Sequence, residues 1–258
     1  MKVIGSQIPA PILSLLQPYK VIAVGEHHGT NEIPELVANM ALALAKTDQV
    51  VLALEIEQAN QKGLNKYMET GDESLLEYLS HFAREYQDGR SSIAMVELLK
   101  KVRLEKNISI LAFDPDFSLD SQNRETKMAE KLLAEIQKKP NHRFLILSGN
   151  IHSSTKIGNF FDPNYRPMAF ELFSMQNSPL EESELISIIT RYDSATIWAC
   201  INDNAEDCGE MKLKIEPSNY STSVDFEKYF LKEPQMSEEG YNATFFIREV
   251  NPSKPYSN

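Results

Sequence analysis

The sequence predicts an α/β fold, with a largely parallel, partly mixed central sheet flanked by helices and a helical insertion after the second strand. Two observations carry this prediction. Short apolar runs of strand length alternate with longer segments of helical spacing, an order that is typical of βαβ units. In addition, the short runs are apolar at successive positions, which is how strands read when helices cover both faces of a parallel sheet.

Four runs in the first part of the chain have the length and composition of buried strands: residues 20–25, 50–55, 108–114 and 143–149. Apolar residues at helical spacing fill the intervals between them. These helical segments are residues 33–47, the interrupted stretch 58–105 and residues 123–139. Pro140 cannot continue the last of these helices, so that helix ends before the fourth strand.

The second part of the chain changes in character. Four segments, "PMAFELFS", "LISIITRY", "SATIWACI" and "ATFFIREV", are strand-like and separated by polar turns, so we expect them to extend the sheet, partly in antiparallel pairs. Residues 202–234 are rich in Asp, Glu and Ser and are predicted to form a surface excursion. We expect one domain over residues 1–251, followed by a flexible tail at 252–258.

Length and charge limit the classes of function. The 258 residues suit a single α/β domain, and the net charge of −11 argues against nonspecific binding to nucleic acid or to an anionic membrane. No stretch approaches the roughly 20 apolar residues that span a bilayer. The beginning of the sequence lacks a signal-peptide pattern, which favours a cytoplasmic protein. Cys200 and Cys208 are then two free thiols, and a hairpin-closing bridge is the alternative if the chain is exported.

Ionisable residues follow four predicted strands at the point where each strand ends. The first strand is followed by Glu26 and His28, the second ends in Glu55, the third ends in Asp114, and the fourth is followed by His152. Parallel strands keep their ligand sites beyond their carboxyl ends, at one edge of the sheet. The sequence therefore predicts that these side chains gather at that edge.

The same spacing, Gly-x-x-His, occurs after the first and the fourth strand, and it places His28 and His152 in equivalent positions. Two imidazoles and a carboxylate can hold a divalent metal such as Zn²⁺, Mn²⁺ or Co²⁺, with His28, Glu55 and His152 as the ligands. Equally, one imidazole can activate a water as a general base while the other stabilises the developing oxyanion. Both arrangements lead to hydrolysis.

The segments "GEHHGTNE", "LALE" and "GNIH" together resemble the superfamily that groups erythromycin esterases, haem-binding ChaN-like proteins and Tiki/TraB proteases. The resemblance runs from about residue 21 to residue 152, and "DGRSSIAMVELLKKVR" is similar to the ChaN-like branch. It implies an α/β fold and catalytic roles for Glu26, His28, Glu55, Arg90 and His152. The esterase motif has one more residue between its glutamate and histidine, so the resemblance does not extend to macrolides as substrates.

Several of these residues also have structural interpretations. His27 is expected at the rim of the site, because its side chain should point away from that of His28. Arg90 can bind a substrate carboxylate or phosphate in a bidentate manner, or pair with Asp88 on the surface. Glu57 competes with Glu55 but more readily opens the following helix. Asp114 is followed by proline, a common turn opener. His81 and His142 are expected to be solvated.

These observations favour a hydrolase that cleaves an ester or amide bond in a small-molecule or peptide substrate, with or without a divalent metal. The first alternative is a protein that binds haem or another iron-containing ligand, for which Tyr86 and the five histidines are the available ligands. The second alternative is a non-catalytic interaction protein built on the same scaffold. No sequence feature indicates the substrate or the oligomeric state.

Overall fold

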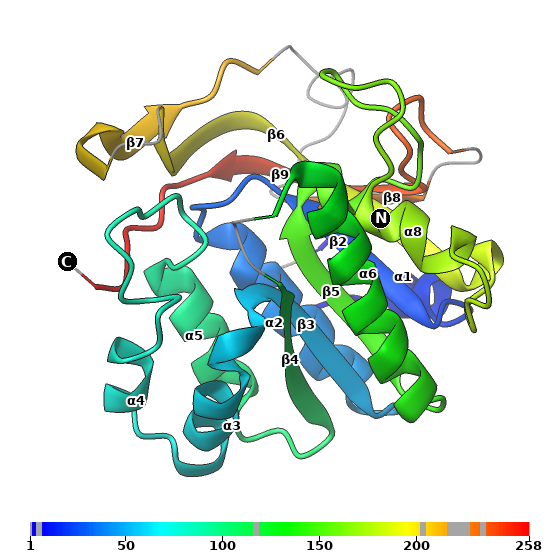
Figure 1. Cartoon of the computed structure of the whole chain (residues 1–258), viewed down its shortest axis with the longest axis horizontal. Helices are drawn as coiled ribbons and strands as arrows, with labels where there is room; N and C mark the ends of the chain where they lie inside the picture. Colours follow the sequence, from blue (N-terminus) through cyan, green and yellow to red (C-terminus); the bar gives the residue numbers. More distant parts are fainter. Residues whose placement is uncertain are drawn as a thin grey trace.

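A computed structural model describes residues 2–3, 7–115, 119–201, 205–215, 228–232 and 236–257. Across these residues nine strands form a sheet in the order β1-β8-β9-β6-β2-β5-β3-β4, with β7 paired to β6 (Figure 1). The strands are β1 (Lys2–Val3), β2 (Val21–Glu26), β3 (Val50–Glu57), β4 (Ile108–Asp114), β5 (Arg143–Gly149), β6 (Leu185–Cys200), β7 (Cys208–Lys212), β8 (Lys228–Lys232) and β9 (Ala243–Val250). The helices with α-helical turns are α1 (Ala10–Leu16), α2 (Glu32–Leu44), α3 (Gln61–Thr70), α4 (Ser74–Glu77), α5 (Ile93–Val102), α6 (Ser121–Lys138), α7 (Asn150–Ser153) and α8 (Met168–Ser174).

The predicted sheet type is confirmed. The strands β4, β3, β5, β2, β6 and β9 lie side by side and are all parallel. Antiparallel pairs occur where β8 joins β9 and β1, and where β7 joins β6. Consequently the carboxyl ends of β2, β5, β3 and β4, which carry the predicted site residues, are neighbours at one edge of the sheet.

Helices cover both faces of this sheet, and strand residues alternate between the two cores. On one face Ile22, Leu52 and Leu145 pack with α1, α2, α3 and α5. On the other face Val51 and Phe144 pack with α6 and α8. Each fully buried large apolar side chain contributes roughly 1.5–3 kcal/mol to folding, which explains why these strands are apolar at successive positions.

Two expectations for the second part of the chain are wrong. The segment "PMAFELFS" forms helix α8, not a strand, and it buries Met168, Ala169 and Leu172 against the core that contains α6. Pro167 precedes the first turn, where a proline needs no amide hydrogen, and the buried residues have helical rather than alternating spacing. The two segments at 185–192 and 194–201 are not separate strands, because β6 runs through both of them.

The expected surface excursion at 202–234 is only partly described. Its residues 202–204, 216–227 and 233–234 lie outside the described residues, whereas β7 and β8 within it are members of the sheet. Cys200 and Cys208 pair across the β6–β7 ladder and form a disulfide, so the expectation of two free thiols is wrong. The physical reason is the hairpin, which places the two side chains directly opposite one another.

The end of the chain is held against the domain instead of forming the expected flexible tail. Pro252 and Pro255 make isolated β-bridges, and Ser253 donates its backbone amide to the carbonyl of Gly29. The backbone amide of Tyr256 bonds to Ser91, and in Figure 1 this red segment passes beside the loop between α4 and α5. These bonds satisfy backbone groups that a tail would leave to water. No helix in the described ranges is both long enough and apolar enough to cross a membrane.

Candidate active site

The two predicted histidines converge on one carboxylate. His28 Nε2 lies 3.6 Å from Glu55 Oε2, and His152 Nε2 lies 3.6 Å from Glu55 Oε1. Each imidazole bonds through its other nitrogen to a second acid: His28 Nδ1 is 2.9 Å from Glu26, and His152 Nδ1 is 2.6 Å from Glu125. The site therefore contains two Glu–His pairs that face each other across Glu55.

Gly149 permits this close approach. A Cβ atom at position 149 would lie 3.1 Å from His28 Nε2 and 3.4 Å from the ring of His152, so a side chain would push the imidazoles apart. The Gly149 backbone amide also donates a 2.8 Å hydrogen bond to Glu55 Oε2. The second Gly-x-x-His motif thus serves the site twice, by leaving room for two rings and by holding the carboxylate between them.

Two guanidinium groups hold the acids of the site. Arg124 donates to Glu55 Oε1 at 2.7 Å, and bonds Asp114 through two nitrogens at 2.9 and 2.7 Å. Its remaining nitrogen lies 3.1 Å from His152 Nε2. Arg90 lies 3.3 Å from Glu55 and 3.5 Å from Asp114, and it also pairs with Asp88. Asp114 is fully buried, so its role exceeds that of a turn opener.

Arg90 departs from both of its sequence interpretations. It does pair with Asp88, but the pair is not on the surface, since Arg90 is only 7% exposed. Its bonds to three carboxylates make it a support for Glu55, and a substrate anion would have to displace one of those acids. The guanidinium that lies next to an imidazole is that of Arg124.

The sequence pattern did not predict Arg124 and Glu125 as site residues. They lie in a helix with many charged residues, and such a pattern is typical of a solvent-exposed helix face. Asp120 accepts a hydrogen bond from the Asn123 amide and starts α6, so both residues fall in its first turns. A positive charge in the first turn of a helix is unfavourable for the helix dipole, and this unusual position of Arg124 is the sequence feature that could have indicated a role in the site. Glu125 is 1% exposed, and its second oxygen accepts a hydrogen bond from the amide of Met168 at the start of α8.

Burial and charge act in opposite directions on the pKa values. Burial disfavours the imidazolium form of His28, but Glu55 and Glu26 outweigh it and raise the pKa above 6.5. The pKa of His152 is raised in the same way, with Glu55 and Glu125 overcoming burial. Burial favours neutral Glu55, yet the two histidines and the two arginines hold its pKa well below 4.5. Glu55 is therefore the stable negative charge of the site.

Glu26 behaves differently from Glu55. Burial raises the pKa of Glu26, and the hydrogen bond to His28 only partly offsets this effect. Its Oε2 atom is buried and has no hydrogen-bond partner in the part of the chain that the structure describes. Glu26 therefore orients His28 while keeping one acceptor position unfilled.

The competing acid and a further histidine form a separate cluster. Glu57 bonds His81 at 2.8 Å and pairs with Arg84; burial opposes its ionisation, but these partners lower its pKa to about 2. His81 is fully buried, so the expectation that it is solvated is wrong. Its Nε2 atom lies 3.2 Å from the backbone carbonyl of Arg90, which links this cluster to the loop that carries Arg90.

A metal does not fit the side chains as they stand. The three expected ligands were His28, Glu55 and His152, but Arg124 bonds both Glu55 and His152 and so occupies the positions where a cation would bind. Within the described ranges, no group of three His, Cys, Asp or Glu side chains is arranged to hold a metal ion. A dication beside two guanidinium groups would also be repelled.

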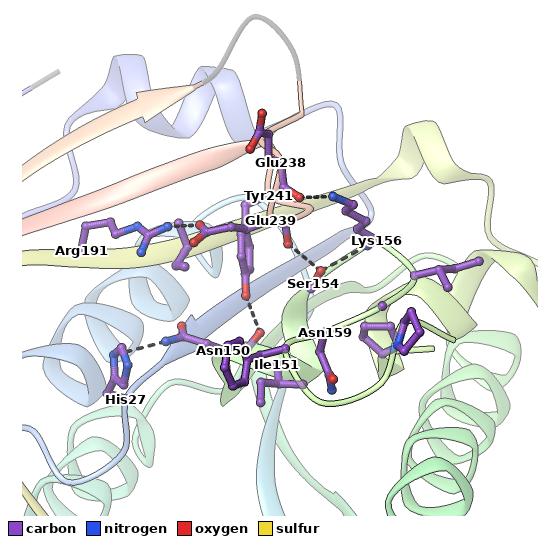
Figure 2. Close-up of a pocket in the computed structure, with 16 residues that line it drawn as sticks. His27, Asn150, Ile151, Ser154, Lys156, Asn159, Arg191, Glu238, Glu239 and Tyr241 are labelled. Carbon is purple, nitrogen blue, oxygen red and sulfur yellow. Dashed lines mark hydrogen bonds and ion pairs between the residues drawn. The ribbon is translucent and has the colours of Figure 1, made fainter. Parts of the chain in front are cut away.

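A cavity of about 650 Å³ opens beside these residues, and Figure 2 shows the side chains that line it. His27 lines it and accepts a 3.2 Å hydrogen bond from Asn150, which agrees with the expected rim position. On another wall, Tyr241 donates its hydroxyl to the Asn150 carbonyl, and Arg191 pairs with Glu239.

No family model and no curated protein sequence matches the chain. Solved structures do match it. A succinoglycan biosynthesis protein is 11% identical with a TM-score of 0.69, and the match covers 98% of this chain and 95% of that one. An erythromycin esterase variant in its open conformation is 8% identical with a TM-score of 0.74, over 95% and 94% of the two chains. ChaN of Campylobacter jejuni with cofacial haem is 16% identical with a TM-score of 0.43, over 77% and 88%.

Identities this low speak for the fold alone, and the weakest of the three matches carries no argument. The other two matches extend over nearly the whole of both chains, so they include the second part of the sheet, which contains none of the sequence motifs. The chain has the fold of this erythromycin esterase and of this succinoglycan biosynthesis protein, which agrees with the esterase part of the resemblance.

Proposed function

We propose that the protein is a hydrolase of carboxylic ester or amide bonds and that it activates water with its own side chains. The observation that carries the proposal is the pair of Glu–His units whose Nε2 atoms both face Glu55. Burying this many ionisable groups is costly, and such clusters of perturbed pKa values gather at catalytic sites. The fold match to an esterase is compatible with the proposal but is too distant to carry it.

In this proposal His28 is the general base. Its Nδ1 atom faces the Glu26 carboxylate and so carries the proton, which leaves the Nε2 lone pair free in the neutral ring. The 3.6 Å separation from Glu55 is longer than a hydrogen bond, so Nε2 remains available to take a proton from water. His28 is also the more exposed of the two imidazoles: 22% of its side chain is exposed, against 14% for His152.

His152 and Arg124 are the proposed electrophilic side of the site. Glu125 fixes the ring of His152, whose Nε2 atom accepts a hydrogen bond from Arg124 while the ring is neutral. The pKa of His152 is raised, and once the ring gains its proton, Nε2 becomes a second donor beside Arg124. A cationic ring beside the Arg124 guanidinium can stabilise the negative charge that forms on the attacked carbonyl oxygen. Glu55 and Arg90 then act as positioning residues, since they hold these groups without facing the substrate.

The direct test is hydrolysis of 4-nitrophenyl esters and 4-nitroanilides by the wild-type protein and by His28→Asn and His152→Asn. We expect each substitution to lower kcat/KM by roughly 10²-fold or more. His142→Asn is the matched control, because His142 lies before β5 at the opposite edge of the sheet and should leave activity unchanged. Activity that survives both active-site substitutions would contradict the proposal.

The same assay separates the remaining alternatives. Dialysis against a chelator should leave hydrolysis unchanged, because Arg124 occupies the positions that a metal would need. Addition of haem should produce no new Soret band. An inactive wild-type protein that gains such a band would instead favour the haem-binding alternative, and one that gains neither activity nor a band would favour the interaction protein.

A further inference from the structure

The cavity of about 650 Å³ shares its walls with the two segments that carry the catalytic histidines (Figure 2). His27 follows β2 directly before His28, and Asn150 begins the helix that carries His152. The hydroxyl of Tyr241 fixes this wall by donating a 2.6 Å hydrogen bond to the Asn150 carbonyl. The volume lies within the range of small-molecule sites, so a substrate held at the histidines can extend into this cavity.

Apolar side chains make up much of the lining, and several are unusually exposed. Ile151 is 44% exposed, Ile157 is 45% exposed, and Phe160 is 94% exposed. Exposed apolar side chains gathered around a cavity are typical of ligand sites. The apolar members of the lining are Ile151, Ile157, Phe160, Pro163, Pro167 and Ile189.

The charged groups of the lining balance in number, and two of them form an ion pair. Arg191 pairs with Glu239, and Lys156 donates its ammonium group to the backbone carbonyl of Glu238. Burial lowers the pKa of His27, and the neighbouring His28 and Arg191 lower it further, which disfavours a positive charge on this ring. An anionic ligand at Arg191 would compete with Glu239 for the guanidinium, whereas an uncharged one leaves that pair intact.

We propose that this cavity binds an uncharged, apolar group. Joined to the hydrolase proposal, on which this second step rests, the substrate is a neutral ester or amide whose apolar part fills the cavity beside the histidines. Substrates that carry a carboxylate or phosphate in that part are disfavoured, because the lining holds two acids, Glu238 and Glu239, against its two cations and so has no surplus of positive charge.

Two dyes that differ by one charged group test the binding step without any need for catalysis. N-phenyl-1-naphthylamine is neutral, and 8-anilino-1-naphthalenesulfonate is the same ring system with an added sulfonate. We expect the neutral dye to bind with a saturable, blue-shifted rise in fluorescence, and the sulfonate to bind at least about tenfold more weakly. Equal affinities, or no binding of the neutral dye, would overturn the proposal.

Matched variants locate the bound dye. Ile157→Glu should weaken binding of the neutral dye, whereas Ile201→Glu should not, because Ile201 is an exposed isoleucine outside the cavity lining. Phe160→Ser and Phe161→Ser form a second pair: both side chains are exposed, but only Phe160 lines the cavity. All four positions are on the surface, so each variant is expected to fold, and equal effects within a pair contradict this location.

A third comparison keeps the two proposals apart. His28→Asn should lower kcat/KM by roughly 10²-fold or more and still bind the neutral dye, since His28 does not line the cavity. For the active protein, kcat/KM should be at least about tenfold higher for 4-nitrophenyl butyrate than for 4-nitrophenyl hemisuccinate, which adds a terminal carboxylate. If the neutral dye binds but no substrate is hydrolysed, only the hydrolase proposal is contradicted. If hydrolysis favours the hemisuccinate, only the proposal that the cavity binds an uncharged group is contradicted.

Discussion

His28 follows β2 and His152 lies in α7 after the neighbouring strand β5, and each directs its Nε2 atom at a different oxygen of Glu55, at 3.6 Å in both cases. The two rings therefore share one negative charge and do not titrate independently. Protons leave such a pair in two macroscopic steps whose pKa values belong to the pair.

This coupling predicts a bell-shaped dependence of kcat/KM on pH. The proposed mechanism needs one neutral ring and one imidazolium, so activity rises as the first proton leaves and falls as the second leaves. Because Glu55 and the partner acids raise the pKa of both rings, we expect the optimum to lie above pH 6.5. A rate profile measured from pH 5 to pH 10 tests this, and an optimum below pH 6 would contradict it.

The same raised pKa values affect stability. A histidine whose pKa is higher in the folded protein than in the unfolded chain binds its proton more tightly when folded. Its contribution is complete below about pH 6.5 and is lost as pH rises through the folded pKa. We therefore expect His28→Asn to narrow the difference between urea midpoints measured at pH 6 and pH 9.

Glu55→Gln should lower the pKa of both histidines, since Glu55 is the largest charge that raises each of them. The acid limb of the rate profile then moves to lower pH. The substitution also leaves Arg90 and Arg124 with one acid fewer, and breaking a buried pair costs about 3–5 kcal/mol. Titration of the imidazole resonances by NMR measures the first effect and urea denaturation the second.

Glu26→Gln is the matched comparison for that experiment. Glu26 bonds His28 but not His152, so this change should lower the pKa of His28 and leave that of His152 nearly unchanged. Equal shifts of both rings in Glu26→Gln would show that the pairing is less specific than the distances indicate. Unchanged rings in Glu55→Gln would refute its place at the centre of the site.

Arg124→Lys tests whether planar, multidentate contact is required in addition to positive charge. Lysine retains the charge but cannot bond Asp114 through two nitrogens while reaching Glu55 and His152. We expect kcat/KM to fall by roughly 10²-fold with a much smaller change in KM. Arg166→Lys is the control, because that arginine pairs with Glu171 outside the site. Similar losses in the two variants would argue for a general effect on stability.

Much of this site can be predicted from the sequence, because the sequence shows where each buried strand ends. An apolar run that stops at an acid or a Gly-x-x-His motif identifies both the strand and its edge, and parallel pairing brings those edges together. Arg124 and Glu125 were not predicted because three-dimensional packing, and not local pattern, decides which of many charges on α6 faces inward. Arg90 was placed at the site for its motif, but its partners depend on contacts that the sequence does not reveal.

The errors in the fold have a similar origin. Helix α8 is as apolar as a strand, and its short length hid the helical spacing that its buried residues show. The segment 252–257 is polar and rich in proline, as tails often are, but its backbone groups bond to Gly29, Ile93 and Ser91. Local composition cannot distinguish a segment that is bound by loops from one that extends into solvent.

The disulfide predicts that the protein is more stable under non-reducing conditions. Cys200 and Cys208 close the β6–β7 hairpin, and Trp198 and Cys200 both contact the Gln87 carbonyl, in the loop that leads to Arg90. Closing a loop this short restricts the unfolded chain by about 2–3 kcal/mol. We expect dithiothreitol to lower the urea midpoint of the wild-type protein and to leave the Cys200→Ser/Cys208→Ser double variant unaffected.

Disulfides persist in oxidising compartments, so a bridged protein favours export over the cytoplasm. Alkylation of two thiols in the native protein purified without reductant would contradict the bridge and restore the cytoplasmic interpretation.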